Sequence, residues 1–190
     1  MKKKILIYQD QGTFREGVRH TSSTFQELLG FNYEIQLVSA RDLLQRTWEK
    51  STALLIFPGG ADIPYMKLLK GRGNQRIRSY VENGGAFIGI CAGAYYSGDI
   101  VEFALNTRLE VREERELKFF PGIVRGPLLA PYEYETPSGV RAAKIYCNDL
   151  PISLYYNGGG YFKEAEQKKD VLVLGTYLDK VTLTKKLFQL

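Results

Sequence analysis

The chain has 190 residues, of which 44% are hydrophobic and 25% charged, a composition typical of a globular domain and not of a disordered or fibrous protein. The net charge is +5, and the basic residues are spread along the chain, which argues against a nucleic-acid-binding module. Two cysteines and one histidine argue against a secreted disulfide scaffold and a Cys/His zinc site. No apolar run approaches the ~20 residues of a membrane span, and the low cysteine count favours a reducing compartment, so we expect a cytoplasmic protein. Neither a metal nor a cofactor is expected.

The first half of the chain alternates short apolar runs with helical patterns. The run at residues 5–8 is too short for a signal peptide and predicts a buried strand. Three more strands are predicted at residues 35–38, 53–57 and 86–90. We expect three helices between these strands. The first is capped within residues 21–24 and ends at Gly30. The second is short and contains Leu43, Leu44 and Trp48, and the third has Ile77, Tyr80 and Val81 on one face. This order predicts an α/β fold, flavodoxin-like, with a mostly parallel sheet and helices on both faces.

After about residue 100 the helical periodicity fades, and proline, glycine and tyrosine become frequent. The clearest strands of this half are predicted at residues 141–146, 152–156 and 171–174, as an antiparallel extension of the sheet. No linker or internal repeat is visible, so we expect a single domain over residues 1–190.

Gly89-Ile90-Cys91-Ala92-Gly93 has the glycine-x-nucleophile-x-glycine form of a nucleophile elbow. A sharp turn from strand to helix forces the central residue into strained backbone angles, and small neighbours let the two elements approach. The thiol would then lie at a helix N-terminus, where the helix dipole favours the thiolate. The alternative is that Cys91 is a small buried hydrophobic residue in a glycine-rich turn.

A second glycine turn, Pro58-Gly59-Gly60, follows the predicted strand at residues 53–57. If this strand neighbours the one that leads into Cys91, the backbone N–H groups of Gly60 and Ala92 would meet as two halves of an oxyanion hole. The alternative is an ordinary βα turn that needs glycine for its backbone conformation.

The segment Tyr155-Tyr156-Asn157-Gly158-Gly159-Gly160 offers free backbone N–H groups beside flat aromatic rings. We interpret Tyr156, Asn157 and Gly158 as ligand-binding residues for a small molecule with an amide or carboxylate. The alternative is a structural turn whose tyrosines belong to the core.

These motifs resemble the class I glutamine-amidotransferase-like superfamily. More narrowly, the segments from Pro58 to Tyr65 and from Gly89 to Tyr96, with the segment that begins at Tyr155, resemble the domain at the N-terminus of eukaryotic biotin–protein ligases, which also occurs as stand-alone bacterial proteins. The resemblance extends to about Tyr177 and implies a flavodoxin-like sheet with a cysteine nucleophile and, in the superfamily at large, glutamine-type amide hydrolysis. No biotinyl-adenylate loop is present, so biotin ligation is not predicted.

The resemblance also implies a catalytic histidine and glutamate from a His-Pro-Glu segment near the C-terminus. The chain has no histidine after His20, so we expect this segment to be missing and the usual triad not to form. His20 is the remaining candidate base, placed by the predicted helix at its N-terminus, where its imidazole would stay neutral. The alternative is that His20 caps or orients the loop before this helix.

Two functions follow from these predictions. In the first, Cys91 attacks a carboxamide, with His20 as a substitute base. In the second, the chain is a non-catalytic ligand-binding or regulatory domain that keeps the elbow but has lost its base. A small-molecule ligand is expected in both cases, membrane binding in neither, and a homodimer is left open.

Overall fold

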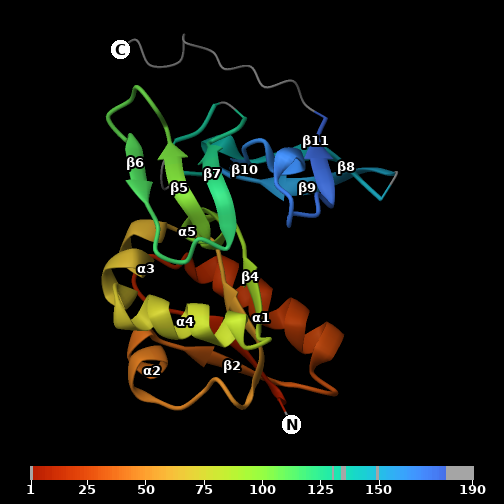
Figure 1. Cartoon of the computed structure of the whole chain (residues 1–190). Helices are drawn as coiled ribbons and strands as arrows, with labels where there is room; N and C mark the ends of the chain where they lie inside the picture. Colours follow the sequence, from red (N-terminus) through yellow and green to blue (C-terminus); the bar gives the residue numbers. More distant parts are fainter. Residues whose placement is uncertain (1, 130, 134–135, 149, 179–190) are drawn as a thin grey trace. The chain divides into compact units, whose positions relative to one another are not determined.

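The computed structural model describes residues 2–129, 131–133, 136–148 and 150–178 (Figure 1). The chain divides into two compact units. The first comprises Met1–Gly98 with Arg115–Phe119, and the second comprises Asp99–Glu114 with Phe120–Leu190. The five residues from Arg115 to Phe119 thus belong to the first unit, although the chain on either side of them belongs to the second.

The first unit is built on a parallel sheet with the strand order β2-β1-β3-β4. The strands are β1 (Lys4–Tyr8), β2 (Glu34–Val38), β3 (Thr52–Phe57) and β4 (Ala86–Gly89). Five helices accompany them: α1 (Arg15–Leu29), α2 (Ala40–Gln45), α3 (Asp62–Leu69), α4 (Arg72–Glu82) and α5 (Ala92–Tyr96).

Side-chain alternation along the central strands divides the core into two layers. Ile5, Ile7 and Ile56 pack with Val18 of α1 on one face of the sheet. The alternate residues of β1 and β3 pack on the other face with the buried side chains of the four remaining helices, namely Leu43, Tyr65, Leu69, Ile77, Tyr80, Ala92 and Tyr96. The parallel sheet with helices on both faces confirms the predicted α/β fold.

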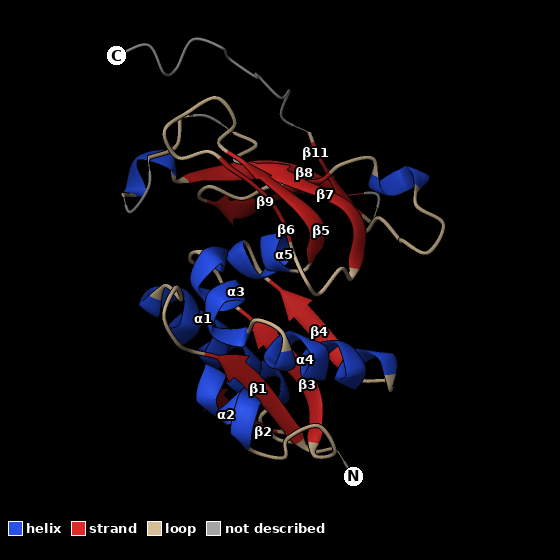
Figure 2. Ribbon diagram, turned by 60° about the vertical axis from the view of Figure 1, so that its left-hand side comes forward, coloured by secondary structure: helices blue, strands red, loops and turns tan. Residues whose placement is uncertain are grey.

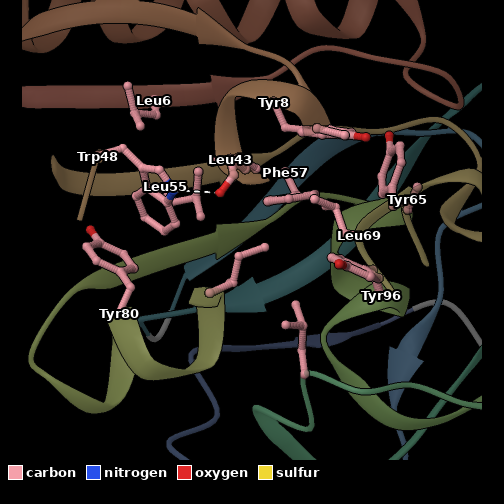
Figure 3. Close-up of a cluster of buried hydrophobic side chains, with 14 residues drawn as sticks. Leu6, Tyr8, Leu43, Trp48, Leu55, Phe57, Tyr65, Leu69, Tyr80 and Tyr96 are labelled. Carbon is pink, nitrogen blue, oxygen red and sulfur yellow. Dashed lines mark hydrogen bonds between the residues drawn. The ribbon is translucent and has the colours of Figure 1, made fainter. Parts of the chain in front are cut away.

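Aromatic rings gather at the carboxyl end of this second layer (Figure 3). Tyr8 stacks on Phe57 with ring centroids 4.5 Å apart, and the rings of Tyr65 and Tyr96 lie 5.8 and 5.1 Å from that of Phe57. Leu117, from the five-residue segment Arg115–Phe119, is buried in the same layer. The core of the first unit therefore includes a residue supplied from far along the chain.

The second unit is composed mainly of strands (Figure 2). One sheet has the order β10-β7-β5-β6 and the other the order β11-β8-β9. The strands are β5 (Gly98–Phe103), β6 (Val111–Glu114), β7 (Phe120–Gly126), β8 (Arg141–Cys147), β9 (Leu150–Tyr156), β10 (Tyr161–Phe162) and β11 (Gly175–Tyr177). Two single-turn 3-10 helices, Pro137–Gly139 and Ala165–Gln167, complete the unit.

Several local predictions were wrong. The antiparallel strands are confirmed, but they form two sheets of their own and do not extend the parallel sheet. Residues 171–174 are not a strand, and the final strand is β11. The C-terminal region where the His-Pro-Glu segment is expected to be missing falls outside the described residues.

The predicted start of α1 was also wrong. The helix begins at Arg15, so the candidate caps at residues 21–24 lie inside it. The reason is tertiary: Thr13 forms an antiparallel bridge with Gly60, and the backbone N–H of Phe14 donates to the Gly59 carbonyl at 3.0 Å. These contacts fix the chain just before Arg15, and the helix follows at once. None of the helices in the described residues is long and apolar enough to cross a bilayer.

Candidate functional site

The glycine turn after β3 and the cysteine after β4 lie side by side at the carboxyl edge of the parallel sheet. Phe57 and Gly89 are register partners at the ends of the two strands, and the N–H of Ile90 donates to the Phe57 carbonyl at 2.9 Å. A Cβ atom placed on Gly59 would lie 3.5 Å from the Cβ of Cys91. The neighbouring-strand arrangement expected from the sequence is therefore present.

Cys91 lies at the sharp turn between β4 and α5, which we call the elbow. It has φ = 51° and ψ = −104° and is the N-cap residue of α5. A Cβ on Gly89 would overlap the Gly93 carbonyl, and one on Gly93 would overlap the Phe57 carbonyl. A positive φ is unfavourable for a residue with a side chain, so the packed glycines on both sides hold Cys91 in place.

Gly60 is held with similar rigidity. Its φ of 144° is accessible mainly to glycine, and an added Cβ would overlap the Gly12 carbonyl oxygen. The N–H of Ala61 donates to the Gly12 carbonyl at 2.8 Å, and the Tyr65 hydroxyl donates to the carbonyls of Pro58 and Gly59, each at 3.2 Å. The loops after β1 and β3 thus fix the direction of the Gly60 N–H.

Two backbone donors converge on the sulfur of the half-buried Cys91. Burial raises the pKa of the Cys91 thiol above its ordinary value, the N–H groups of Ala92 and Gly60 act in the opposite direction by donating to the sulfur, and the charge of Asp62 raises the pKa further. The net result is a raised pKa, so the thiol form predominates at neutral pH. This differs from the expectation that the helix N-terminus would favour the thiolate. The helix α5 has only five residues, and its effect on the thiol does not outweigh that of burial.

A buried ion pair lies next to the elbow and was missed by sequence reasoning. The Nε and Nη2 atoms of Arg115 each lie 2.7 Å from Oδ2 of Asp62, and the Arg115 side chain is fully buried. Nearby, Nδ2 of Asn74 donates to Oε2 of Glu116 at 2.6 Å, and the Tyr96 hydroxyl bonds to Oδ1 of Asn74. Arg115 carries no local signal of this role, because its partner lies 53 positions earlier.

His20 lies elsewhere on the first unit. It is the sixth residue of α1 and does not lie at the helix N-terminus. Its ring is exposed, and Nε2 of the ring lies 3.4 Å from Nη2 of Arg19. Among the hydrogen bonds of the described residues, none joins His20 to Cys91. Gly59, Gly60, Cys91 and Ala92 come together, whereas His20 is not among their contacts.

Tyr156, Asn157 and Gly158 belong to the second unit. Tyr156 is buried in its core, and its hydroxyl accepts from the Leu129 N–H and donates to the Gly159 carbonyl, both at 2.8 Å. Nδ2 of Asn157 lies 3.5 Å from the Thr136 carbonyl, while no group of the described residues forms a hydrogen bond with its buried Oδ1. Gly158 has φ = 70° and faces the Tyr132 ring, which a Cβ would overlap.

The part of the chain that the structure describes contains no candidate metal centre. No group of three or more His, Cys, Asp or Glu side chains in these residues is placed to hold an ion.

Comparison with known proteins gives the family. The family described as biotin-protein ligase, N terminal, matches residues 3–189. An uncharacterized protein from Chlamydia muridarum is 38% identical over 182 residues, which cover 93% of this chain and 70% of that protein. A biotin–protein ligase from Schizosaccharomyces pombe is 35% identical over 182 residues, and the match covers 91% of this chain but 28% of the ligase.

A crystal structure of a ThuA-like protein from Bacteroides uniformis has a TM-score of 0.56 and 16% sequence identity, with 93% of this chain and 68% of that chain covered. At this identity the likeness concerns the fold alone. The match over residues 3–189 and the two relatives above 30% identity lead to one conclusion: the chain belongs to the biotin–protein ligase N-terminal domain family.

Proposed function

We propose that the chain is a glutamine-amidotransferase-like domain whose elbow binds a small molecule through a carbonyl or carboxylate oxygen. The observation that carries the proposal is the convergence of the Gly60 and Ala92 N–H groups on the Cys91 sulfur. Two backbone donors fixed by neighbouring turns are suited to hold one oxygen atom, because they are already oriented before the ligand arrives.

Binding without turnover is the function that the site favours. Burial keeps the Cys91 pKa above its ordinary value, and the imidazole of His20 contacts Arg19 and not the thiol. A thiol without a nearby base is a weak nucleophile at neutral pH. In the Schizosaccharomyces ligase the matching region covers 28% of the protein, so the domain occurs there beside other segments.

Amide hydrolysis is the second candidate, and the strained φ of Cys91 favours it. In this reaction the sulfur attacks the carboxamide carbon while the thiol proton passes to the leaving nitrogen, with His20 as the candidate base. Ammonia departs, a thioester remains on Cys91, and water hydrolyses it to the carboxylic acid and the free thiol. The N–H groups of Gly60 and Ala92 would stabilise the oxyanion of each tetrahedral intermediate.

Thermal unfolding and ammonia release together test the proposal. Free L-glutamine, L-glutamate and a panel of small amides and acids are added to the wild type, to Cys91→Ser and to Cys147→Ser as the matched control. We expect one class of compound to raise Tm by about 5 °C or more at a hundredfold excess over Kd. The increase should persist in Cys91→Ser, and no protein should release ammonia.

Two outcomes would contradict this expectation. Steady ammonia release by the wild type and by Cys147→Ser, but not by Cys91→Ser, would establish the hydrolytic function in place of simple binding. The absence of stabilisation and turnover with every compound of the panel would overturn both candidates.

A further inference from the structure

The helix that follows Cys91 is short and depends on contacts with the rest of the first unit. α5 has five residues, Ala92–Tyr96, and its N-cap Cys91 makes no side-chain capping hydrogen bond. A helix of this length is not stable by itself, because its few hydrogen bonds do not offset the cost of forming the first turn. The backbone of Cys91, with φ = 51°, is also strained. The contacts that hold α5 therefore also hold the elbow.

Backbone hydrogen bonds connect the body of α5 to Cys91. The Cys91 carbonyl accepts from the N–H groups of Ala94 and Tyr95 at 2.9 and 3.0 Å. At a rise of about 1.5 Å per residue, the Cα atoms of Ala92 and Tyr96 are about 6 Å apart along the helix axis. A displacement of the Tyr96 end would therefore be passed on to Cys91 and to the Ala92 N–H.

The side chain of Tyr96 fixes the far end of α5 (Figure 3). Its ring is fully buried, and the ring centroids of Phe57 and Tyr65 lie 5.1 and 5.9 Å away. Its hydroxyl donates to Oδ1 of Asn74, a residue of α4 that is 1% exposed. Burial holds the pKa of the phenol well above its ordinary value, so the hydroxyl keeps the proton that it donates. This hydrogen bond joins α5 to α4 inside the core.

Glu116 determines which way the Asn74 amide faces. Oε2 of Glu116 accepts from Nδ2 of Asn74 at 2.6 Å and from the N–H of Gly71, the N-cap residue of α4, at 2.8 Å. A carboxylate can only accept hydrogen bonds, so the NH2 group of Asn74 faces Glu116 and its amide oxygen is left for Tyr96. Asn74 thus bridges α5 to the segment Arg115–Phe119, which reaches the first unit from far along the chain.

We propose that Asn74 is a positioning residue of the elbow, which acts through Tyr96 to hold α5 in place. The backbone of Cys91 and the Ala92 N–H are then held together with the helix. The inference deepens the proposed function, on which it rests, by naming what keeps one of the two backbone donors directed at a bound oxygen. Asn74 acts through α5 and is not itself a ligand-binding residue.

The pH dependence of Cys91 alkylation tests this role without a known ligand. The thiol loses its proton to the buffer, and the thiolate displaces iodide from iodoacetamide to form a thioether. Rates are measured on Cys147→Ser, so that Cys91 is the reacting thiol. Into this protein are introduced Tyr96→Phe, which keeps the ring, and Asn74→Leu, which is of similar size. We expect both to move the pH profile to higher pH and to lower the rate at pH 7 about threefold, because a displaced Ala92 N–H stabilises the thiolate less.

A purely structural role predicts a change in the opposite direction. If the substitutions only loosened the packing around the elbow, the thiol would be less buried, its pKa would fall and alkylation would become faster. The charge of Asp62, which raises the pKa of Cys91, is present in every variant. Tyr80→Phe is the matched control, because it removes another buried hydroxyl of α4, one that donates to the Thr52 carbonyl at 3.3 Å. It should lower Tm but leave the pH profile of Cys91 in place.

A folded Tyr96→Phe variant whose profile is unchanged or moved to lower pH would overturn the inference, whether or not Asn74→Leu folds. Circular dichroism checks the fold of each variant. The double variant should have the profile of Asn74→Leu alone, because the same hydrogen bond is missing from both. Alkylation requires no ligand, so a failed ligand screen with a shifted profile would count against the proposed function and not against Asn74. A ligand that stabilises the wild type, with an unchanged profile in the variants, would count against Asn74 alone.

Discussion

At the scale of single residues, the elbow depends on positions where a side chain is absent. Gly60 has φ = 144° and lies against the Gly12 carbonyl, whereas Gly59 has no such restriction and a Cβ there meets Cys91 at an ordinary 3.5 Å. Adjacent glycines of one turn thus have different requirements, and this offers a matched pair of variants.

We predict that Gly60→Ala lowers the free energy of unfolding by about 1–3 kcal/mol, because alanine is strained at this φ and its Cβ overlaps a backbone oxygen. Gly59→Ala should change it by less than about 1 kcal/mol. Urea unfolding of both variants measures the difference. Equal stability of the two proteins would show that the turn tolerates a side chain at Gly60.

The residues of the elbow could be predicted from the sequence because their signal is local. Gly59, Gly60, Cys91 and Ala92 occur in two short motifs after apolar runs, and the parallel pairing of β3 with β4 then brings them together. The role of Arg115 could not be predicted, since ion pairs between distant positions leave no periodic pattern. The roles of His20, Tyr156, Asn157 and Gly158 stay predictions.

At the scale of elements, α1 begins without a side-chain cap. Its N-cap residue Phe14 is exposed and makes no capping hydrogen bond, whereas Ser39 of α2 forms a complete capping box with Asp42. The backbone contact between Phe14 and Gly59 fixes the start of α1 instead.

We predict that Phe14→Ser stabilises the protein by about 0.5–2 kcal/mol, because a serine hydroxyl can accept from the free N–H groups of the first turn. Ser39→Ala, the matched variant on α2, should destabilise it by a similar amount. Thermal unfolding of the two variants tests this. A loss of stability in Phe14→Ser would mean that the phenylalanine ring contributes more than a cap can.

Elements with strong apolar runs could be predicted almost to the residue, and elements fixed by tertiary contacts could not. The predicted strand at residues 53–57 is β3, Thr52–Phe57, because it is buried on both faces. The capping pattern at residues 21–24 was misleading, since loop pairing outweighs local propensity at Phe14. Residues 171–174 were predicted as a strand from their apolar character alone, and Leu172 and Leu174 are exposed.

At the scale of the whole molecule, buried phenols link stability to alkaline pH. Burial raises the pKa of Tyr8, Tyr80 and Tyr96 above the ordinary value of 10.0. Below pH 10 these phenols are protonated in both the folded and the unfolded state. Above pH 10 the unfolded state loses its protons first, so the free energy of unfolding falls as the pH rises. The raised pKa of Cys91 acts in the same direction from its own ordinary value of 9.0.

We predict that Tyr8→Phe makes this alkaline loss shallower and stabilises the protein at pH 8 by about 1 kcal/mol, because the Tyr8 hydroxyl is buried and forms no hydrogen bond within the part of the chain that the structure describes. Tyr65→Phe removes a hydroxyl that donates to the Pro58 and Gly59 carbonyls, and it should destabilise the protein. Chemical unfolding from pH 8 to pH 11 compares the two. If the free energy of unfolding of Tyr8→Phe fell above pH 10 as steeply as that of the wild type, Tyr8 would not be a source of the alkaline loss of stability.

The segment Arg115–Phe119 also determines how the gene can be divided. The chain enters the second unit after Gly98, returns to the first for five residues and leaves it again. A fragment that ends at Gly98 lacks both Leu117, a core residue, and Arg115, the partner of Asp62. No contiguous stretch of sequence therefore contains the first unit alone, and an exchange of domains by recombination must carry residues 1–119 together, including the part of the second unit that lies between Gly98 and Arg115.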